Sequence, residues 1–484
     1  MSEIKSLEPK SLWNNFDMIC SIAHPSKKES KLVEALVEFA TRHNLEHTID
    51  KIGNVIIRKP ATKGMENLKG VVLQAHIDMV PQKNADTNHD FATDPILPWI
   101  DNGWVRAKGT TLGADNGIGV AAILAVLEDK NAIHGPIEAL LTIDEETGMT
   151  GAFGLEAGVL KGDILLNLDS ETEGELYVGC AGGIDGTFVF DYKKENTPVG
   201  LSAFALNVTG LKGGHSGMDI ILGRANANKV LFRLFKALEK VNIRISEING
   251  GSLRNAIPRE AFSTVAIPTD KVAEAKSIVE ELTKEVKNEY SLVEPSLEIS
   301  FNATSLLPNV IDLDTQSRLI NAVYACPNGV MRMSDSMEGL TETSTNLAIV
   351  KSDDKAISIS CLLRSSVDSA KMDLAQMMLS VFTLAGAKST FTGAYPGWKP
   401  NMESPILKTM QETYKNLYGK TPKIMAIHAG LECGLLGGVY PNWDMISFGP
   451  TIMNPHSPDE RVNIDSVKKF WDYLLATLKN IPKK

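Results

Sequence analysis

Residues 70–78 have the sequence GVVLQAHID, a nearly continuous apolar run that ends in a histidine and an aspartate. An apolar run this short, bounded by glycine and polar residues, predicts a strand that is buried on both faces of a sheet. Similar runs occupy residues 136–143 (PIEALLTI) and 163–168 (DILLNL), and the apolar segment at 117–129 predicts a helix between the first two strands. Buried strands that alternate with helices indicate an α/β domain with a largely parallel sheet.

A different pattern begins near residue 201. Residues 201–304 predict strands and helices in the order β-α-β-β-α-β, which is the order of a ferredoxin-like unit. A weaker version of this pattern follows over residues 315–394, so we expect the α+β region to be doubled. The α/β pattern then resumes after Gly397. We therefore predict one α/β domain made of residues 1–185 and 390–484, with an α+β domain inserted at residues 186–389.

The composition is that of a soluble globular protein. The chain has 484 residues, of which 43% are hydrophobic, and its formal net charge of -10 argues against a nucleic-acid surface. The five cysteines are scattered and lack C-x-x-C spacing, which predicts reduced thiols rather than a disulfide framework. No secretory leader is recognisable, and no apolar run approaches the roughly 18 residues of a membrane span. We expect a cytoplasmic protein that does not bind membranes.

Acidic and histidine side chains follow the predicted buried strands, at the edge where open α/β sheets bind ligands. Each of them alone is more simply a solvated residue or a helix cap, but together they match a metal centre. Zn²⁺ binds histidine and carboxylate ligands, and two ions about 3.5–4 Å apart need roughly three protein ligands each, with one shared. Glu145 is left over beside a ligand and is suited to be a general base. The predicted ligands are His76, Asp115, Glu146, Asp169 and His456.

Five segments carry a resemblance to a known family. They are LQAHIDMVPQ (73–82), GTTLGADNGIGVAAILA (109–125), LLTIDEETGMTGA (140–152), LLNLDSE (165–171) and MNPHSPDERV (453–462). The chain resembles the co-catalytic zinc peptidases of the M20 clan. Within that clan it is similar to the aminoacylhistidine dipeptidases, also called Xaa-His dipeptidases or bacterial carnosinases.

The resemblance implies a two-zinc catalytic domain in which Co²⁺ or Mn²⁺ could replace zinc. Asp78 would orient His76, and Glu145 would take a proton from a zinc-activated water and then protonate the leaving amine. The water would attack the scissile carbonyl while a zinc ion polarises its oxygen. The implied ligands are His76, Asp115 and Asp169 for one ion, and Asp115, Glu146 and His456 for the other.

The inserted domain would act as a hinged lid. The resemblance makes His215, in GGHSG at 213–217, a stabiliser of the tetrahedral oxyanion. It makes Arg364 a ligand for the C-terminal carboxylate of the substrate, a task that suits the planar guanidinium. Weaker substrate-contact candidates are Asn255, Gly430 and Glu432. The alternatives for these residues are an exposed glycine-rich loop, a surface arginine and a purely structural turn.

The leading hypothesis is zinc-dependent hydrolysis of dipeptides, with Xaa-His peptides such as carnosine implied by the resemblance alone. The first alternative is another hydrolase of the clan, namely an aminotripeptidase, a carboxypeptidase or an N-acyl amino-acid deacylase. The second is a non-catalytic homologue that binds metal or peptide. The resemblance also implies a homodimer, although a doubled lid could mimic such a pairing within one chain.

Overall fold

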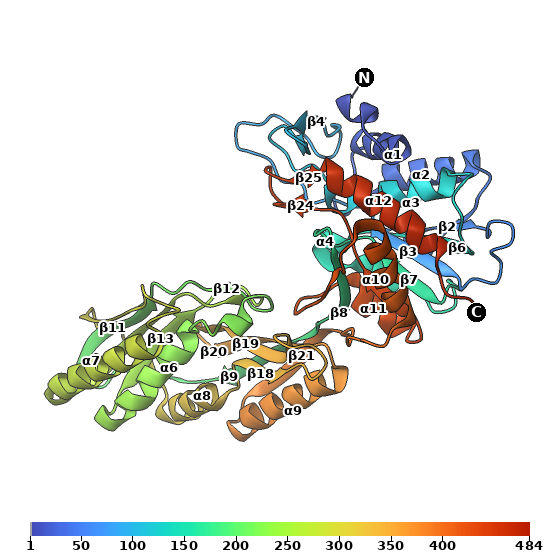
Figure 1. Cartoon of the computed structure of the whole chain (residues 1–484). Helices are drawn as coiled ribbons and strands as arrows, with labels where there is room; N and C mark the ends of the chain where they lie inside the picture. The colour runs from blue at the N-terminus through green and yellow to red at the C-terminus, as the bar shows by residue number, and fades with distance from the viewer. Residues whose placement is uncertain (1) are drawn as a thin grey trace. The chain divides into compact units, whose positions relative to one another are not determined.

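The apolar run at 70–78 forms the central strand β3 (Val71–His76), whose six residues are all buried. In the computed structural model, which describes residues 2–484, β3 lies in an eight-stranded sheet of order β1-β2-β6-β3-β7-β23-β8-β22. Strands β2, β3, β6, β7 and β8 of this sheet are labelled in Figure 1. Strands β6, β3, β7 and β23 run parallel, as expected, whereas β1, β2 and β8 pair antiparallel, so the whole sheet is mixed. The other bounds are β1 (Glu46–Ile49), β2 (Val55–Lys59), β6 (Ile137–Thr142), β7 (Ile164–Asn167), β8 (Glu175–Cys180), β22 (Lys423–Ile427) and β23 (Asp444–Ser447).

Helix α3 (Ala114–Glu128) is apolar on every side because it is covered on every side. It contacts β3 as well as α1 and α12. Its regular part begins after Asn116, since Asp115 and Asn116 have non-helical backbone angles. The remaining helices around this sheet are α1 (Lys10–Cys20), α2 (Ser30–Arg42), α4 (Glu145–Gly148), α5 (Thr150–Gly154), α10 (Pro405–Tyr418), α11 (Glu432–Val439) and α12 (Ile464–Lys479).

A small four-stranded sheet, which the sequence did not predict, joins two distant parts of the chain. Its order is β24-β25-β5-β4, and β25 pairs antiparallel with β5. The strands have two to four residues each, too few to show an alternating pattern. Their bounds are β4 (Pro98–Asp101), β5 (Trp104–Ala107), β24 (Ile452–Met453) and β25 (Arg461–Asn463).

The inserted region contains two ferredoxin-like halves that share one sheet. The first half has strand order β16-β11-β15-β13 and the second β19-β20-β9-β21, which is the same order reversed. The predicted doubling is confirmed, but the second half takes its first strand, β9 (Gly182–Asp191), from before the first half in the chain. The first half consists of β11 (Leu201–Thr209), α6 (Ala227–Leu238), β13 (Arg244–Gly250), β15 (Ala261–Pro268), α7 (Val272–Glu289) and β16 (Glu298–Ala303). The second adds α8 (Leu313–Ala325), β19 (Thr341–Ser352), β20 (Ala356–Ser365), α9 (Asp368–Leu384) and β21 (Lys388–Tyr395).

The two halves meet where β13 pairs antiparallel with β19, at Asn249–Lys351 and Gly250–Val350. One continuous hydrophobic core, from Ile184 to Ala385, lies under both halves and includes the stacked rings of Phe188 and Phe382. Shorter elements are β10 (Lys194–Asn196) with β17 (Asn309–Ile311), β12 (Gly214–His215) with β14 (Ala256–Ile257), and β18 (Gly329–Met333) on β19. Single 3₁₀ turns occur at Glu3–Ser6, Ile220–Leu222, Glu239–Val241 and Thr269–Lys271.

The structure divides into two units. Unit 1 contains the residues up to Gly179, Pro400–Ala426 and Leu431–Lys484, and unit 2 contains Cys180–Lys399 and Ile427–Gly430. Unit 2 thus begins six residues before the predicted insert, ends ten residues after it, and also takes in a short piece of the later chain. Among residues 2–484, no helix has the length and apolar character needed to cross a membrane.

Candidate metal centre

The predicted metal ligands of unit 1 gather at one edge of the eight-stranded sheet. His76 is the last residue of β3, Asp169 follows β7, and Glu146 lies in α4, just after β6. Parallel strands end at the same edge, so these three side chains are brought together by the sheet itself. Asp115 comes from the first turn of α3, and His456 from the loop between β24 and β25.

These five side chains form two groups that share Asp115. In the first, His76 Nε2 lies 3.1 Å from Asp115 Oδ1 and 3.3 Å from Asp169 Oδ1. In the second, His456 Nε2 lies 3.3 Å from Asp115 Oδ2 and 3.0 Å from Glu146 Oε2. Within each group the ligand atoms lie within 4.8 Å of one another. Asp115 therefore turns one carboxylate oxygen towards each group, as a bridging ligand would.

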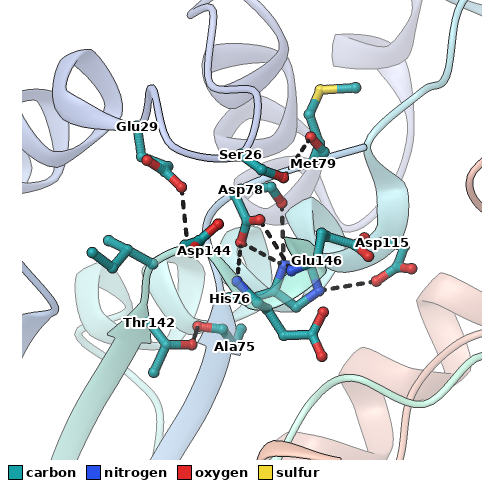
Figure 2. Close-up of polar contacts among 12 residues, drawn as sticks. Ser26, Glu29, Ala75, His76, Asp78, Met79, Asp115, Thr142, Asp144 and Glu146 are labelled. Atoms are coloured by element: carbon teal, nitrogen blue, oxygen red, sulfur yellow. Dashed lines mark hydrogen bonds and ion pairs between the residues drawn. The ribbon is translucent and has the colours of Figure 1, made fainter. Parts of the chain in front are cut away.

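Asp78 has two tasks, of which the sequence predicted one. Its Oδ1 lies 3.3 Å from His76 Nδ1, which suits the predicted orienting role. The same carboxylate also accepts hydrogen bonds from the backbone N–H groups of Glu145, at 2.9 Å, and Glu146, at 3.2 Å. Figure 2 shows Asp78 with His76 and Glu146. Burial opposes its ionisation, but His76 and the Glu145 amide outweigh burial and lower the pKa of Asp78 to about 2.

The turn that carries Glu145 and Glu146 is held in place by side chains that the sequence did not single out. Asp144 has a left-handed backbone, with φ of 51°, and its N–H donates to the buried Glu29 at 3.1 Å (Figure 2). The Asp144 carboxylate accepts hydrogen bonds from Thr147 and Thr150. The only sequence signal for this arrangement was the acidic run DEE itself, because Glu29 is more than a hundred residues away.

Burial and the neighbouring charges shift the pKa values of four of these groups. Burial lowers the pKa of His76, but Asp169, Asp115 and Asp78 outweigh it and raise that pKa well above its usual value. The hydrogen bonds that His456 donates to Asp115 and Glu146 raise the pKa of His456 to about 11. Burial, then neighbouring carboxylates, raise the pKa of Asp169 to about 6 and also raise that of Glu145. A buried cluster this acidic calls for compensating cations.

The residues present fit a pair of divalent metal ions. Two histidines and three carboxylates are the donors that Zn²⁺ and related ions bind. Glu146 Oε1 is buried and has no hydrogen-bond partner among residues 2–484, as expected of an oxygen that is free to bind a metal ion. Glu145 also lies within 4.8 Å of ligand atoms of His76 and Glu146, so it stands beside the centre as expected of a base.

Glu432, a predicted substrate contact, belongs to unit 1 and is 1% exposed. Its Oε2 accepts hydrogen bonds from Gln74 Nε2 at 2.5 Å and Thr142 Oγ1 at 2.9 Å, whereas its Oε1 has no partner. Burial and the charge of Asp169 raise its pKa to about 7. Glu432 thus lies at the carboxyl ends of β3 and β6, with one buried oxygen to spare.

The other predicted substrate contacts lie in unit 2. His215 Nδ1 accepts hydrogen bonds from the N–H groups of Gly217, at 3.2 Å, and Met218, at 3.0 Å. The neutral ring therefore carries its proton on Nε2, which leaves that atom as a donor. Burial and the charge of Arg364 lower the pKa of His215 and favour this neutral form. Such a ring can donate to an oxyanion.

Arg364 is a buried cation without a buried anion. It is 5% exposed, donates from Nη1 to the Tyr395 hydroxyl at 3.2 Å, and forms no ion pair with any residue between 2 and 484. Its Nε atom is buried without a partner. A buried guanidinium in this condition is prepared to receive a carboxylate.

Residues 427–430 belong to unit 2, in which the N–H group of Ala181 donates to the carbonyl oxygens of Ile427 at 3.1 Å and Ala429 at 3.0 Å. This segment also packs closely against Gly217. A side chain there would overlap the carbonyl oxygen of His428, so only glycine allows this approach. His428 is buried and shares a hydrogen bond of 2.7 Å with Ser344, a contact that the sequence did not predict. Gly430 lies in this segment, and Asn255 is exposed beside β14.

Comparison with known proteins agrees with the geometry. The sequence model of peptidase family M20/M25/M40 matches residues 72–480. The chain belongs to this family. It is 51% identical, over the full length of both chains, to the cytosol non-specific dipeptidase of Escherichia coli (strain K12).

Comparison with solved structures agrees with this family membership. Aminoacylhistidine dipeptidase from Vibrio alginolyticus is 55% identical, with a TM-score of 0.96 over 100% of this chain and 99% of the other. Aminopeptidase PepT from Bacillus cereus is 16% identical, with a TM-score of 0.57 over 98% and 99%, and shares the fold. The predicted resemblance to M20 peptidases is thus confirmed.

Proposed function

We propose that this M20 family member hydrolyses dipeptides at a two-metal centre, with zinc as the metal. The observation that carries the proposal is the pair of ligand groups that share Asp115, with Glu145 beside them. The names of two relatives, a non-specific dipeptidase and an aminoacylhistidine dipeptidase, support dipeptides as the substrate class. The name of the E. coli relative also supports a cytosolic location.

In the proposed mechanism, His76, Asp115 and Asp169 hold one ion, and Asp115, Glu146 and His456 hold the other. When bound, the two ions supply Lewis-acid polarisation of the scissile carbonyl and a more acidic water. Glu145 accepts the proton of the attacking water and returns it to the leaving amine. Asp78 keeps His76 oriented and holds the turn that carries Glu145.

Recognition of a short substrate requires groups for its two charged ends. We assign the substrate carboxylate to Arg364, which lacks an anion, and the substrate ammonium to Glu432, whose Oε1 lacks a partner. His215 donates from Nε2 to the developing oxyanion. Asn255 and Gly430 are proposed as further substrate contacts on the strength of the resemblance.

An assay with a peptide panel tests this function. The metal-free protein should cleave nothing, and added Zn²⁺, Mn²⁺ or Co²⁺ should restore cleavage of dipeptides. Carnosine and other Xaa-His peptides test the narrower preference, because the two relatives differ in name on this point. Absence of cleavage with all three metals would refute the proposal, and faster cleavage of tripeptides or acylated amino acids would favour another M20 activity.

Matched substrates test the role of Arg364. Arg364→Ala should raise KM for a dipeptide and leave KM for the corresponding dipeptide amide, which has no carboxylate, almost unchanged. Glu432→Gln should instead raise KM for substrates with a free amino group and leave KM for their N-acetylated forms almost unchanged. Equal effects on free and blocked peptides would show that these side chains serve the fold alone.

A further inference from the structure

Glu460 is a buried carboxylate that accepts four hydrogen bonds from consecutive backbone N–H groups. It is 2% exposed and lies just before β25. Its Oε2 accepts from Leu112 at 2.7 Å and Gly113 at 3.0 Å, and its Oε1 accepts from Ala114 at 2.7 Å and Asp115 at 3.2 Å. Both oxygens of one side chain are thus used to hold a single stretch of backbone.

This stretch needs an outside support. The first N–H groups of a helix have no partner within the helix, and no side chain of the helix N-cap bonds to them here. Gly113 has a left-handed backbone, with φ of 70°, and Asp115 and Asn116 are non-helical, so helical hydrogen bonds do not determine the shape of this turn. The four hydrogen bonds to Glu460 determine the shape of this turn instead. Glu460 therefore fixes the position of the backbone that carries the Asp115 side chain.

The same residue also anchors the segment that carries His456. His456 has a left-handed backbone, with φ of 58°, and its side chain is 53% exposed in the loop between β24 and β25. Burial therefore contributes little to its position. Glu460 follows it by four residues, and β25 then pairs with β5, which leads into the loop before Asp115. Glu460 is the point at which the His456 loop is tied to the Asp115 turn.

We propose that Glu460 is a positioning residue for the metal site formed by Asp115, Glu146 and His456. This inference rests on the proposed two-metal centre. Two of the three ligands of that site, Asp115 and His456, reach it through backbone that Glu460 holds. The other site takes His76 and Asp169 from the ends of β3 and β7, where the sheet supports them, and shares only Asp115.

The substitution Glu460→Gln removes this support with little change in volume. The amide group keeps one acceptor oxygen but turns an NH₂ group towards two of the four N–H donors, so about half of the contacts become unfavourable. Loss of such an outer-shell partner weakens metal binding by about 10- to 100-fold. We expect the wild-type protein to bind two equivalents of Zn²⁺ tightly, and the variant to bind the second equivalent 10- to 100-fold more weakly than the first.

A matched control exists in the eight-stranded sheet, near the start of β6 and away from the proposed metal ligands. Glu138 in β6 is 7% exposed and accepts hydrogen bonds from the N–H groups of Lys161 at 2.7 Å and Gly162 at 2.8 Å. Glu138→Gln should lower the melting temperature of the metal-free protein and leave both Zn²⁺ affinities unchanged. Glu460→Asp keeps both oxygens on a shorter side chain, so its second Zn²⁺ affinity should lie between those of Glu460→Gln and wild type.

The measurement is a titration of the metal-free proteins with Zn²⁺ in competition with a chromophoric chelator, repeated with Co²⁺ to record its absorption spectrum. In peptidase assays at limiting Zn²⁺, kcat of Glu460→Gln should fall with KM unchanged, and excess Zn²⁺ should restore kcat. Tight binding of two Zn²⁺ equivalents by both Glu460 variants would overturn the inference. An equal loss of Zn²⁺ affinity in Glu138→Gln would also overturn it. If the wild type itself binds fewer than two equivalents, the proposed metal centre fails, and the inference with it.

Discussion

At the scale of single residues, the proposed centre would give two neighbouring glutamates different tasks. Glu146 turns Oε2 towards His456, at 3.0 Å, and belongs to the second ligand group. Glu145 is the preceding residue but is not part of either group that shares Asp115. Both amides donate to Asp78, so one carboxylate sets the direction of both side chains.

The substitution Glu145→Ala should therefore abolish most activity without loss of metal. Removal of a general base typically costs about 10²- to 10⁴-fold in kcat. Metal content, measured by elemental analysis after dialysis, should stay at the wild-type value. A parallel fall in metal content would make Glu145 a ligand rather than a base. Glu34→Gln, at an exposed position of α2, is the control: it should keep the activity and the metal content of the wild type.

Metal binding should also release protons. The pKa of His456 is raised to about 11, so we expect its ring to be protonated at pH 7 in the metal-free protein, and the neighbouring carboxylates raise the pKa of His76 as well. Metal ions bind the neutral ring, so binding should displace at least one proton per protein, and affinity should fall as the pH is lowered. Calorimetric titration with Zn²⁺ in buffers of different ionisation enthalpy measures this number. Absence of a buffer dependence would contradict the assignment of the two histidines.

At the scale of elements, the inserted region depends on a joint between its two ferredoxin-like halves. β13 and β19 share only two registered residue pairs, so close packing around the joint must contribute to its strength. Gly251 follows β13 with φ of 74°, and a side chain there would overlap the carbonyl oxygen of Ala348. The joint therefore depends on a residue without a Cβ atom.

Two glycine substitutions separate this packing from backbone strain. Gly200 has φ of 82° and open space around it, so Gly200→Ala should cost about 1–2 kcal/mol from the left-handed backbone alone. Gly251→Ala should cost about 1–3 kcal/mol more, because the neighbouring strand has to move. Urea unfolding of both variants measures the difference. Equal losses would show that the joint tolerates a methyl group at Gly251.

At the scale of the whole molecule, the proposed ligands all lie in unit 1. Unit 2 has a hydrophobic core of its own and contributes none of the five. Binding of a metal stabilises only the part that holds it. The two units should therefore respond differently when the metal is removed.

Scanning calorimetry with and without a chelator checks this expectation. Zn²⁺ at about 1,000 times its Kd should stabilise unit 1 by about 4 kcal/mol. Unit 2 should melt at the same temperature in both conditions, and Glu460→Gln should reduce the shift of unit 1. A shift of the whole profile as one transition would mean that the two units unfold together.

The sequence alone was sufficient for what depends on local pattern and residue chemistry. The apolar run at 70–78 predicted β3, and the β-α-β-β-α-β order predicted the doubled insert, because periodicity reports which faces are buried. His76, Asp115, Glu146, Asp169 and His456 could be selected because they follow strands or match family motifs. The roles of His215 and Arg364, and the homodimer, remain predictions.

Tertiary structure decided what depends on contacts between distant segments. Three features have no periodic signal in the sequence: the assignment of β9 to the second half, the small sheet of β25 and β5, and the placement of residues 427–430 in unit 2. The same holds for Glu29 and Glu460, which bind backbone N–H groups more than a hundred residues away. Every residue except proline carries such an N–H group, so residue type and spacing cannot reveal which carboxylate will bind it. The sequence thus predicted the donors of the proposed metal centre, and the fold determined which distant residues contact the segments that carry them.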